Sequence, residues 1–150
     1  MSRSRLRMSL VLTLGLGAMV FAQTGSAPAV QFLPSAKVQG AFAKGGTLIE
    51  TDTYKVLASR RDADGQAEIH ARDTDIFYFL EGTATLVTGG KLVNGKQTAP
   101  DEERGESVDG GKEQPVAKGD VVTIPRGVPH VFKSVKGPFL YYTVKVTAPK

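Results

Sequence analysis

The stretch that decides the fold of this chain runs from Glu68 to Gly82 and reads EIHARDTDIFYFLEG. Its second half is rich in aromatic and branched residues and ends at a glycine, which is typical of a β-strand followed by a corner. Side chains two positions apart in a strand point to the same face. Glu68 therefore shares a face with His70, and Asp75 shares one with Phe77. Two carboxylates and an imidazole converge on an apolar space, which predicts a binding site.

The remainder of the chain predicts an all-β domain. One short helix is expected at 36–44, with Ser35 as its cap and Gly45-Gly46 at its end. Short apolar runs separated by Gly, Asp and Pro turns follow, with corners at Glu81-Gly82 and Gly137-Pro138. The expected strands are 47–50, 54–60, 66–71, 75–80, 83–88, 121–124, 128–132 and 139–146. Strands without intervening helices indicate an antiparallel sandwich or barrel.

The segment 89–118 breaks this rhythm with six glycines and a dense run of charges at 101–104. An Asn94-Gly95 pair after two apolar residues is a hairpin-turn signal, so part of the segment should pair with itself. We interpret the segment as a surface hairpin with a solvated tip. The alternative is a loop that closes over the mouth of a pocket.

The N-terminus has the pattern of a secretory signal. Arg3, Arg5 and Arg7 precede the uncharged apolar run 8–22, and cleavage after Ala22 is expected. A membrane anchor is the weaker alternative, because a full span needs about 20 residues. We therefore expect a secreted or periplasmic protein with no membrane association after cleavage. A flexible leader at 23–34 and a single domain at 35–150 should follow.

The charge of the chain argues against a nucleic-acid partner. Its formal net charge of +4 falls to +1 without the three N-terminal arginines, because 16 basic and 15 acidic residues remain. A nearly neutral domain lacks the electrostatic footprint that nucleic-acid binding requires. The chain has no cysteine, so it has neither a disulfide framework nor a lipid-attachment site.

A second motif lies at GDVVTIPRGVPH, Gly119 to His130. Gly, five residues, Pro, one residue, Gly, two residues and His is the spacing of the second cupin motif, and the chain resembles the cupin superfamily over about 47–146. The asparagine that often follows is replaced by Ser134. The first cupin motif, His-x-His, a short gap, Glu and an aromatic strand, aligns with Glu68, His70 and Asp75, although two of its residue types differ.

The resemblance implies an antiparallel cupin β-barrel with a metal centre formed by Glu68, His70, Asp75 and His130. Carboxylates and imidazoles suit a divalent ion such as Mn, Fe, Ni or Zn. Two anionic ligands would neutralise such an ion and lower its Lewis acidity. The alternative is a metal-free barrel in which the carboxylates pair with the histidines or with Arg72.

The residues around these ligands predict a place for a small molecule. Arg72 could receive a substrate carboxylate, or could instead reach solvent or pair with a neighbouring aspartate. Phe77, Phe79 and Phe132 would line an apolar pocket, or would form the barrel core. One of Tyr141 and Tyr142 should face inward.

No catalytic residue is assigned, and the reaction stays open among dioxygenase, isomerase and lyase types. The alternative function is a non-catalytic protein that binds a small ligand without an essential metal. A homodimer is a further expectation for such a domain.

Overall fold

The computed structural model describes residues 29–150, of which Gln31–Lys150 form one compact unit. The expected signal peptide at 1–22 and the first half of the expected leader, 23–28, lie outside the described residues. Residues 29–34 are in neither helix nor strand. Between residues 29 and 150, no helix has both the length and the apolar character needed to cross a membrane.

The described chain is one short helix followed by strands. Their order is α1 (Ser35–Phe42), β1 (Gly46–Glu50), β2 (Tyr54–Arg61), β3 (Ala67–His70), β4 (Asp73–Thr88), β5 (Lys91–Val93), β6 (Lys96–Ala99), β7 (Glu102–Gly105), β8 (Ser107–Asp109), β9 (Lys112–Ala117), β10 (Val121–Ile124) and β11 (His130–Thr147).

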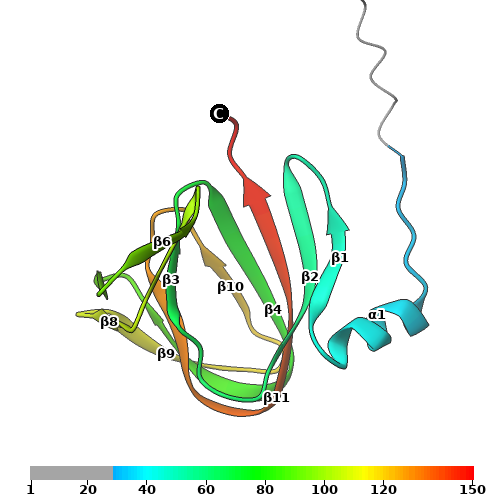
Figure 1. Ribbon diagram of the computed structural model, residues 1–150. Coiled ribbons are helices and arrows are strands. Elements are labelled where there is room, and N and C mark those ends of the chain that lie inside the picture. The colour runs from blue at the N-terminus through cyan, green and yellow to red at the C-terminus, as the bar shows by residue number, and fades with distance from the viewer. Residues whose placement is uncertain (1–28) are drawn as a thin grey trace, which may run out of the picture. The chain divides into compact units, whose positions relative to one another are not determined.

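The strands curl into the predicted antiparallel β-barrel, which is confirmed (Figure 1). Within residues 29–150, nine strands join one sheet, and β5 pairs with β8 in a separate two-stranded sheet. Strands β4 and β11 are the longest and pair with each other from Asp73 to Thr88. On either side of this pair, β2 continues from β11, whereas β9 and β10 continue from β4.

The two predicted corners are bends within continuous strands, so the strand ends expected there are wrong. Glu81-Gly82 lies within β4 and Gly137-Pro138 lies within β11. Gly82 has a φ of 77°, and a Cβ there would lie 2.7 Å from the carbonyl oxygens of Lys136 and Pro138. Only glycine combines this left-handed backbone with such a close approach, so here it bends a strand that continues.

The helix differs from its prediction in its cap. Ser35 is its first residue, and Pro34 precedes it without a side-chain hydrogen bond to the helix end. The expected apolar face is half-buried, and the ring of Phe42 meets that of Tyr142 edge-on at 5.1 Å. Tyr142 therefore faces outward toward α1, whereas Tyr141 is buried within the barrel.

The predicted pairing of the segment 89–118 with itself is confirmed, but as two strand pairs rather than as one hairpin that turns at Asn94-Gly95. The residues before Asn94-Gly95 pair with β8, and those after it pair with β7. Strand β7 in turn pairs with β3, and β9 pairs with β4. The segment thus folds partly on itself, through the β5–β8 and β6–β7 pairs, and is joined to the barrel wall by the β3–β7 and β4–β9 pairs.

Aromatic rings fill the larger of two apolar clusters in the barrel interior. Phe77, Phe79, Phe132, Phe139 and Tyr141 are buried and in mutual contact, with neighbouring ring centroids 5.1–6.2 Å apart. A second, smaller cluster, formed by Ala67, Val87, Val108 and Val131, lies under the β5–β8 sheet. The aromatic core fixes the two long strands, which carry Asp75 and His130.

Candidate metal centre

Four buried side chains from three strands converge near one end of the aromatic core. Glu68 and His70 come from β3, Asp75 from β4 and His130 from the start of β11. Glu68, His70 and His130 each offer one ligand atom within 4.8 Å of the other two. The nearer oxygen of Asp75 lies 3.4 Å from Nε2 of His70 and 3.7 Å from Nε2 of His130. The structure therefore brings all four predicted ligands together.

Backbone pairing holds these side chains in place. His130 lies opposite Glu68 in the β11–β3 pair, so the two polar residues start from neighbouring strands. The turn before β11 is tied to β3, because the amide of Gly127 donates to the carbonyl of His70 at 2.7 Å. Gly127 has a φ of 78°, which explains the glycine in the second motif.

His130 presents an unsatisfied nitrogen to the cluster. Its Nδ1 lies 3.1 Å from the carbonyl oxygen of Val128, which can only accept, so Nδ1 carries the hydrogen. In the neutral ring Nε2 then holds a lone pair. That atom is buried and has no hydrogen-bond partner, and oxygens of Glu68 and Asp75 lie 3.4 and 3.7 Å away.

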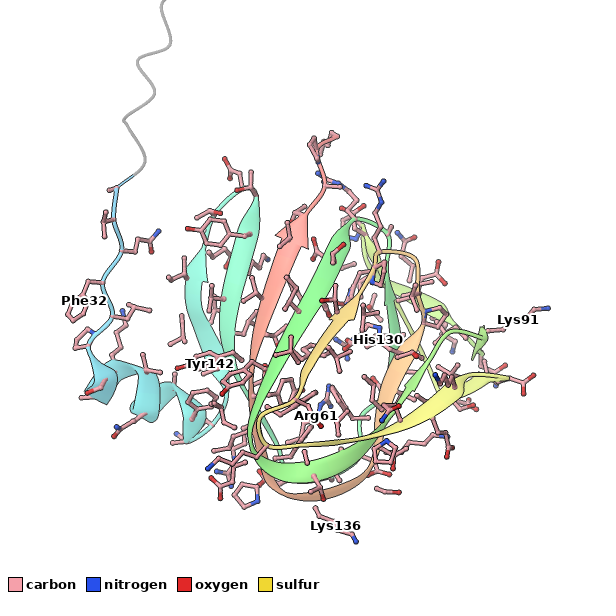
Figure 2. All side chains as sticks on the ribbon, turned by 180° about the vertical axis from the view of Figure 1, so that it is seen from behind. Phe32, Arg61, Lys91, His130, Lys136 and Tyr142 are labelled. Atoms are coloured by element: carbon pink, nitrogen blue, oxygen red, sulfur yellow. The ribbon has the colours of Figure 1, made fainter. Side chains whose placement is uncertain are left out.

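This orphaned nitrogen fits a metal ion. Buried polar atoms nearly always have a partner, and a lone pair aimed at two carboxylates is unfavourable unless a metal ion lies among them or Nε2 carries a proton that it donates to Glu68. A carbonyl on the other ring nitrogen is also the usual way a metal-binding histidine is oriented. Figure 2 shows His130 inside the barrel, whereas Lys136 projects outward from the bend of β11.

Two cations that were not predicted complete the cluster. Lys145 on β11 donates from Nζ to both oxygens of Asp75 at 2.8 Å and to Nε2 of His70 at 2.9 Å. The guanidinium of Arg104 on β7 lies 2.8 Å from a carboxylate oxygen of Glu68, and its Nε lies 2.7 Å from one of Glu102. With neutral imidazoles, three carboxylates face two cations, which leaves one net negative charge.

Glu102 on β7 also approaches the cluster, with its carboxylate 3.6 Å from Nδ1 of His70. The two ring nitrogens of His70 thus face different partners, Lys145 at Nε2 and Glu102 at Nδ1. A carboxylate beside the outer nitrogen of a histidine orients the ring and favours a lone pair on the inner nitrogen.

Both buried carboxylates are held in the ionised form. Burial acts to raise the pKa of Glu68, but His130, Arg104 and His70 together lower it to about 2. Burial likewise opposes ionisation of Asp75, but interactions with His70 and Lys145 lower its pKa below the usual range. Carboxylates that stay ionised at neutral pH are available as ligands.

The predicted substrate-binding residues lie in different places. Arg72 donates to the carbonyl of Ala148 and lies 3.6 Å from Asp101, so it is near the barrel mouth. The ring of Phe77 is 6.2 Å from that of His130. Their role in binding a substrate stays a prediction.

Phe79 and Phe132 lie in the aromatic core. Phe132 also lies under the guanidinium of Arg61, 5.3 Å from ring centroid to carbon, and Nε of Arg61 donates to the hydroxyl of Tyr141 at 2.8 Å. A role for these two rings in lining a substrate pocket also stays a prediction.

A cavity of about 330 Å³ opens beside His70 at the mouth of the barrel. The segment 89–118 contributes residues 99–102 to its wall, so part of this segment does lie at a pocket mouth. The other side comes from the turn between β1 and β2 and from the ends of β4 and β11. Besides His70, its lining is Thr51, Asp52, Lys55, Asp73, Ala99, Pro100, Asp101, Glu102 and Thr147.

Comparison with known proteins agrees with the fold. A family model described as Cupin matches residues 51–150. No curated protein matches the chain.

Solved structures resemble the chain at low sequence identity. Hydroquinone 1,2-dioxygenase from Sphingomonas sp. TTNP3, with 4-hydroxybenzoate bound, is 13% identical, with a TM-score of 0.57 over 85% of each chain. Hydroquinone 1,2-dioxygenase PnpCD, in complex with Cd²⁺ and 4-hydroxybenzonitrile, is 12% identical, with a TM-score of 0.57 over 83% of this chain and 82% of that one. A Bacillus halodurans protein is 15% identical, with a TM-score of 0.54 over 85% and 86%. At these identities the likeness shows the fold.

Proposed function

The chain belongs to the cupin family, and from that premise we propose that it binds a divalent metal ion in its barrel and acts on a small molecule there. Glu68, His70 and His130 would hold the ion, and Asp75 would lie beside it. Mn, Fe, Ni and Zn all suit imidazole and carboxylate ligands.

The observation that carries this proposal is the buried Nε2 of His130, which has no hydrogen-bond partner and faces carboxylates. Its Nδ1 is oriented by Val128, so the ring cannot turn to satisfy Nε2 without losing that contact. A bound divalent ion would supply Lewis acidity toward an oxygen-containing ligand.

The two neighbouring cations revise the expected charge of the centre. Glu68 and Asp75 alone would neutralise a divalent ion, but Arg104 and Lys145 already offset them. With Glu102 included, and as long as Lys145 stays beside the cluster, the loaded cluster would carry one net positive charge. The cavity beside His70 is itself lined by four carboxylates and one lysine, so charge does not select the class of ligand that enters there.

The first reaction class to test is dioxygenation. Two structural neighbours are hydroquinone 1,2-dioxygenases, and one of them was solved with Cd²⁺. The likeness is of fold, so isomerase and lyase chemistry stay in the screen. In each case this chain's own part is to hold the ion and to exclude water from its inner side with the aromatic core, in which Phe77 lies against His130.

The proposal is tested by metal analysis of protein purified without chelator. We expect near-stoichiometric Mn, Fe, Ni or Zn in the wild type and its loss in Glu68→Ala and His130→Ala. Glu103→Ala is the matched control, because Glu103 is an exposed carboxylate on β7. A folded wild type that contains no metal, and takes up none of the four ions when they are added, would refute the proposal.

A second function is favoured by Lys145. Its ammonium already satisfies Asp75 and one nitrogen of His70, so the cluster is partly balanced without an ion. This arrangement supports a non-catalytic cupin that binds a small ligand and needs no metal. It predicts that a ligand screen by thermal shift gives the same hits in EDTA as in added metal.

We also propose that the protein is exported and loses its first 22 residues, on the strength of the arginines and the apolar run at its N-terminus. Intact mass of the protein recovered from the periplasm of a bacterial host should begin at Gln23. A product that retains Met1 in the membrane fraction would contradict cleavage.

A further inference from the structure

We propose that Lys145 is an internal competitor for the metal, which occupies the ligand atoms of Asp75 and His70 and must be displaced when an ion binds. This inference rests on the proposed metal centre and specifies how the chain regulates it. The ammonium of Lys145 would thereby set the metal affinity of the site.

The geometry makes the two occupants mutually exclusive. Nζ of Lys145 lies 2.9 Å from Nε2 of His70 and 2.8 Å from both oxygens of Asp75. A neutral imidazole has one lone pair, which can accept a hydrogen bond or bind a metal but not both. Coordination by His70 Nε2 at about 2.0–2.1 Å therefore requires the ammonium to leave that atom.

The position of Lys145 is fixed by strand register. It lies directly opposite Asp75 in the β11–β4 pair, and both side chains point into the barrel. A lysine at this position meets the carboxylate without any other rearrangement. The contact is therefore built into the two longest strands of the fold.

Lys145 has somewhere to go when it is displaced. Its side chain keeps 18% of its surface exposed, and the flexible stem of a lysine can move its ammonium by several ångströms. The neighbouring cavity carries the carboxylates of Asp52 and Asp73 on its wall. A displaced ammonium would remain near negative charge there.

Lys145 should also stabilise the metal-free protein. Removing it leaves Asp75 buried with no lysine partner, and an unpaired buried carboxylate is destabilising. The same removal frees His70 and Asp75 for an ion. Loss of Lys145 should thus lower the stability of the apo protein and raise its metal affinity together.

The test compares Lys145→Met with Lys136→Met. Methionine keeps the length of the side chain and removes its charge. Lys136 is the matched control, because it lies on the same strand as Lys145 but is exposed and projects away from the barrel (Figure 2). Affinities for Mn²⁺ and Zn²⁺ are measured by competition with a chelator of known strength, and melting temperatures are measured in EDTA and in excess Mn²⁺.

We expect Lys145→Met to bind both ions about tenfold or more tightly than the wild type. It should melt several degrees lower in EDTA and gain more from Mn²⁺. Lys136→Met should match the wild type in both affinities and both melting temperatures. Lys145→Gln is the second variant, in case the methionine variant does not fold. Like Lys145→Met, it should bind both ions more tightly than the wild type and melt at a lower temperature in EDTA.

The outcomes separate this inference from the metal proposal. Equal or weaker metal binding in the Lys145 variants, with a wild type that binds metal, overturns the inference and leaves the metal centre standing. Binding in the variants but not in the wild type supports the inference in its strongest form and overturns metal binding by the natural chain. Absence of binding in every folded protein overturns both.

Discussion

Replacing Glu68 by glutamine should remove one pH-dependent contribution to stability. The pKa of this carboxyl falls from 4.5 to about 2 in the folded protein, because His130, Arg104 and His70 outweigh its burial. A depressed folded-state pKa adds stability above the unfolded value, and that stability is lost as the pH falls from about 4.5 toward about 2. At about 1.4 kcal/mol per pH unit, the full contribution at neutral pH is about 3 kcal/mol.

The measurement is urea unfolding of the wild type and Glu68→Gln in EDTA, from pH 7 to pH 3. The free-energy difference between the two proteins isolates this carboxyl from the other groups that titrate in both. We expect that difference to fall by roughly 2 kcal/mol over the range, because about two fifths of the contribution survives at pH 3. Glu113→Gln, at an exposed carboxylate on β9, controls for the loss of one negative charge.

A difference between wild type and Glu68→Gln that stays constant from pH 7 to pH 3 would refute this reasoning. It would mean that Arg104 and the two histidines do not hold Glu68 in its ionised form. A difference that grows toward acid would reverse the sign of the argument, because burial would then dominate and the carboxyl would titrate above its ordinary pKa.

Two further predictions concern the barrel itself. Gly82→Ala should cost about 3 kcal/mol, since it combines left-handed strain with a clash against two carbonyls, and should lower the melting temperature by about 10 °C. Gly119→Ala, with a φ of 93° but open space around it, should cost about 1–2 kcal/mol, so equal losses would contradict the clash. Phe79→Ala should cost about 3–5 kcal/mol by chemical unfolding, because this ring is fully buried. Tyr78→Ala, on the opposite, half-exposed face of the same strand, should cost less than half as much, and similar losses would contradict the assignment of the two faces.

Local sequence was sufficient for the parts of the site that lie within one strand or turn. The alternation that pairs Glu68 with His70 is a property of any strand, and both side chains are buried together. The spacing from Gly119 to His130 likewise corresponds to a short strand, a turn at Gly127 and the entry to the next strand. These features depend on covalent neighbours, so they could be read directly.

The cations could not be predicted, because their positions depend on pairing between distant segments. Lys145 reaches Asp75 through the register of β11 with β4, 70 residues apart in sequence. Arg104 reaches Glu68 because β7 pairs with β3, and nothing in the glycine-rich sequence around it indicates that partner. Two buried carboxylates imply that cations lie nearby, but the sequence did not indicate which lysines or arginines these are.

The strand ends predicted at Gly82 and Gly137 were wrong for a related reason. A glycine such as Gly82 signals a change of backbone direction, but whether the strand ends there depends on the strand beside it. Strand β11 bends at the same level, around Gly137, so the pairing with β4 resumes on the far side. The sequence therefore predicts two strands where the structure has β4, and two more where it has β11.

The long β4–β11 pair should make amide hydrogen exchange along both strands sensitive to what the barrel binds. Asp75 and His130 lie near opposite ends of the pairing, and the bend at Gly82 lies between them along β4. Opening either strand to exchange its amide hydrogens would disrupt the aromatic core as well as the cluster. A ligand that binds the cluster should therefore slow exchange of amides on both sides of the bend alike, with protection that tracks its global binding free energy.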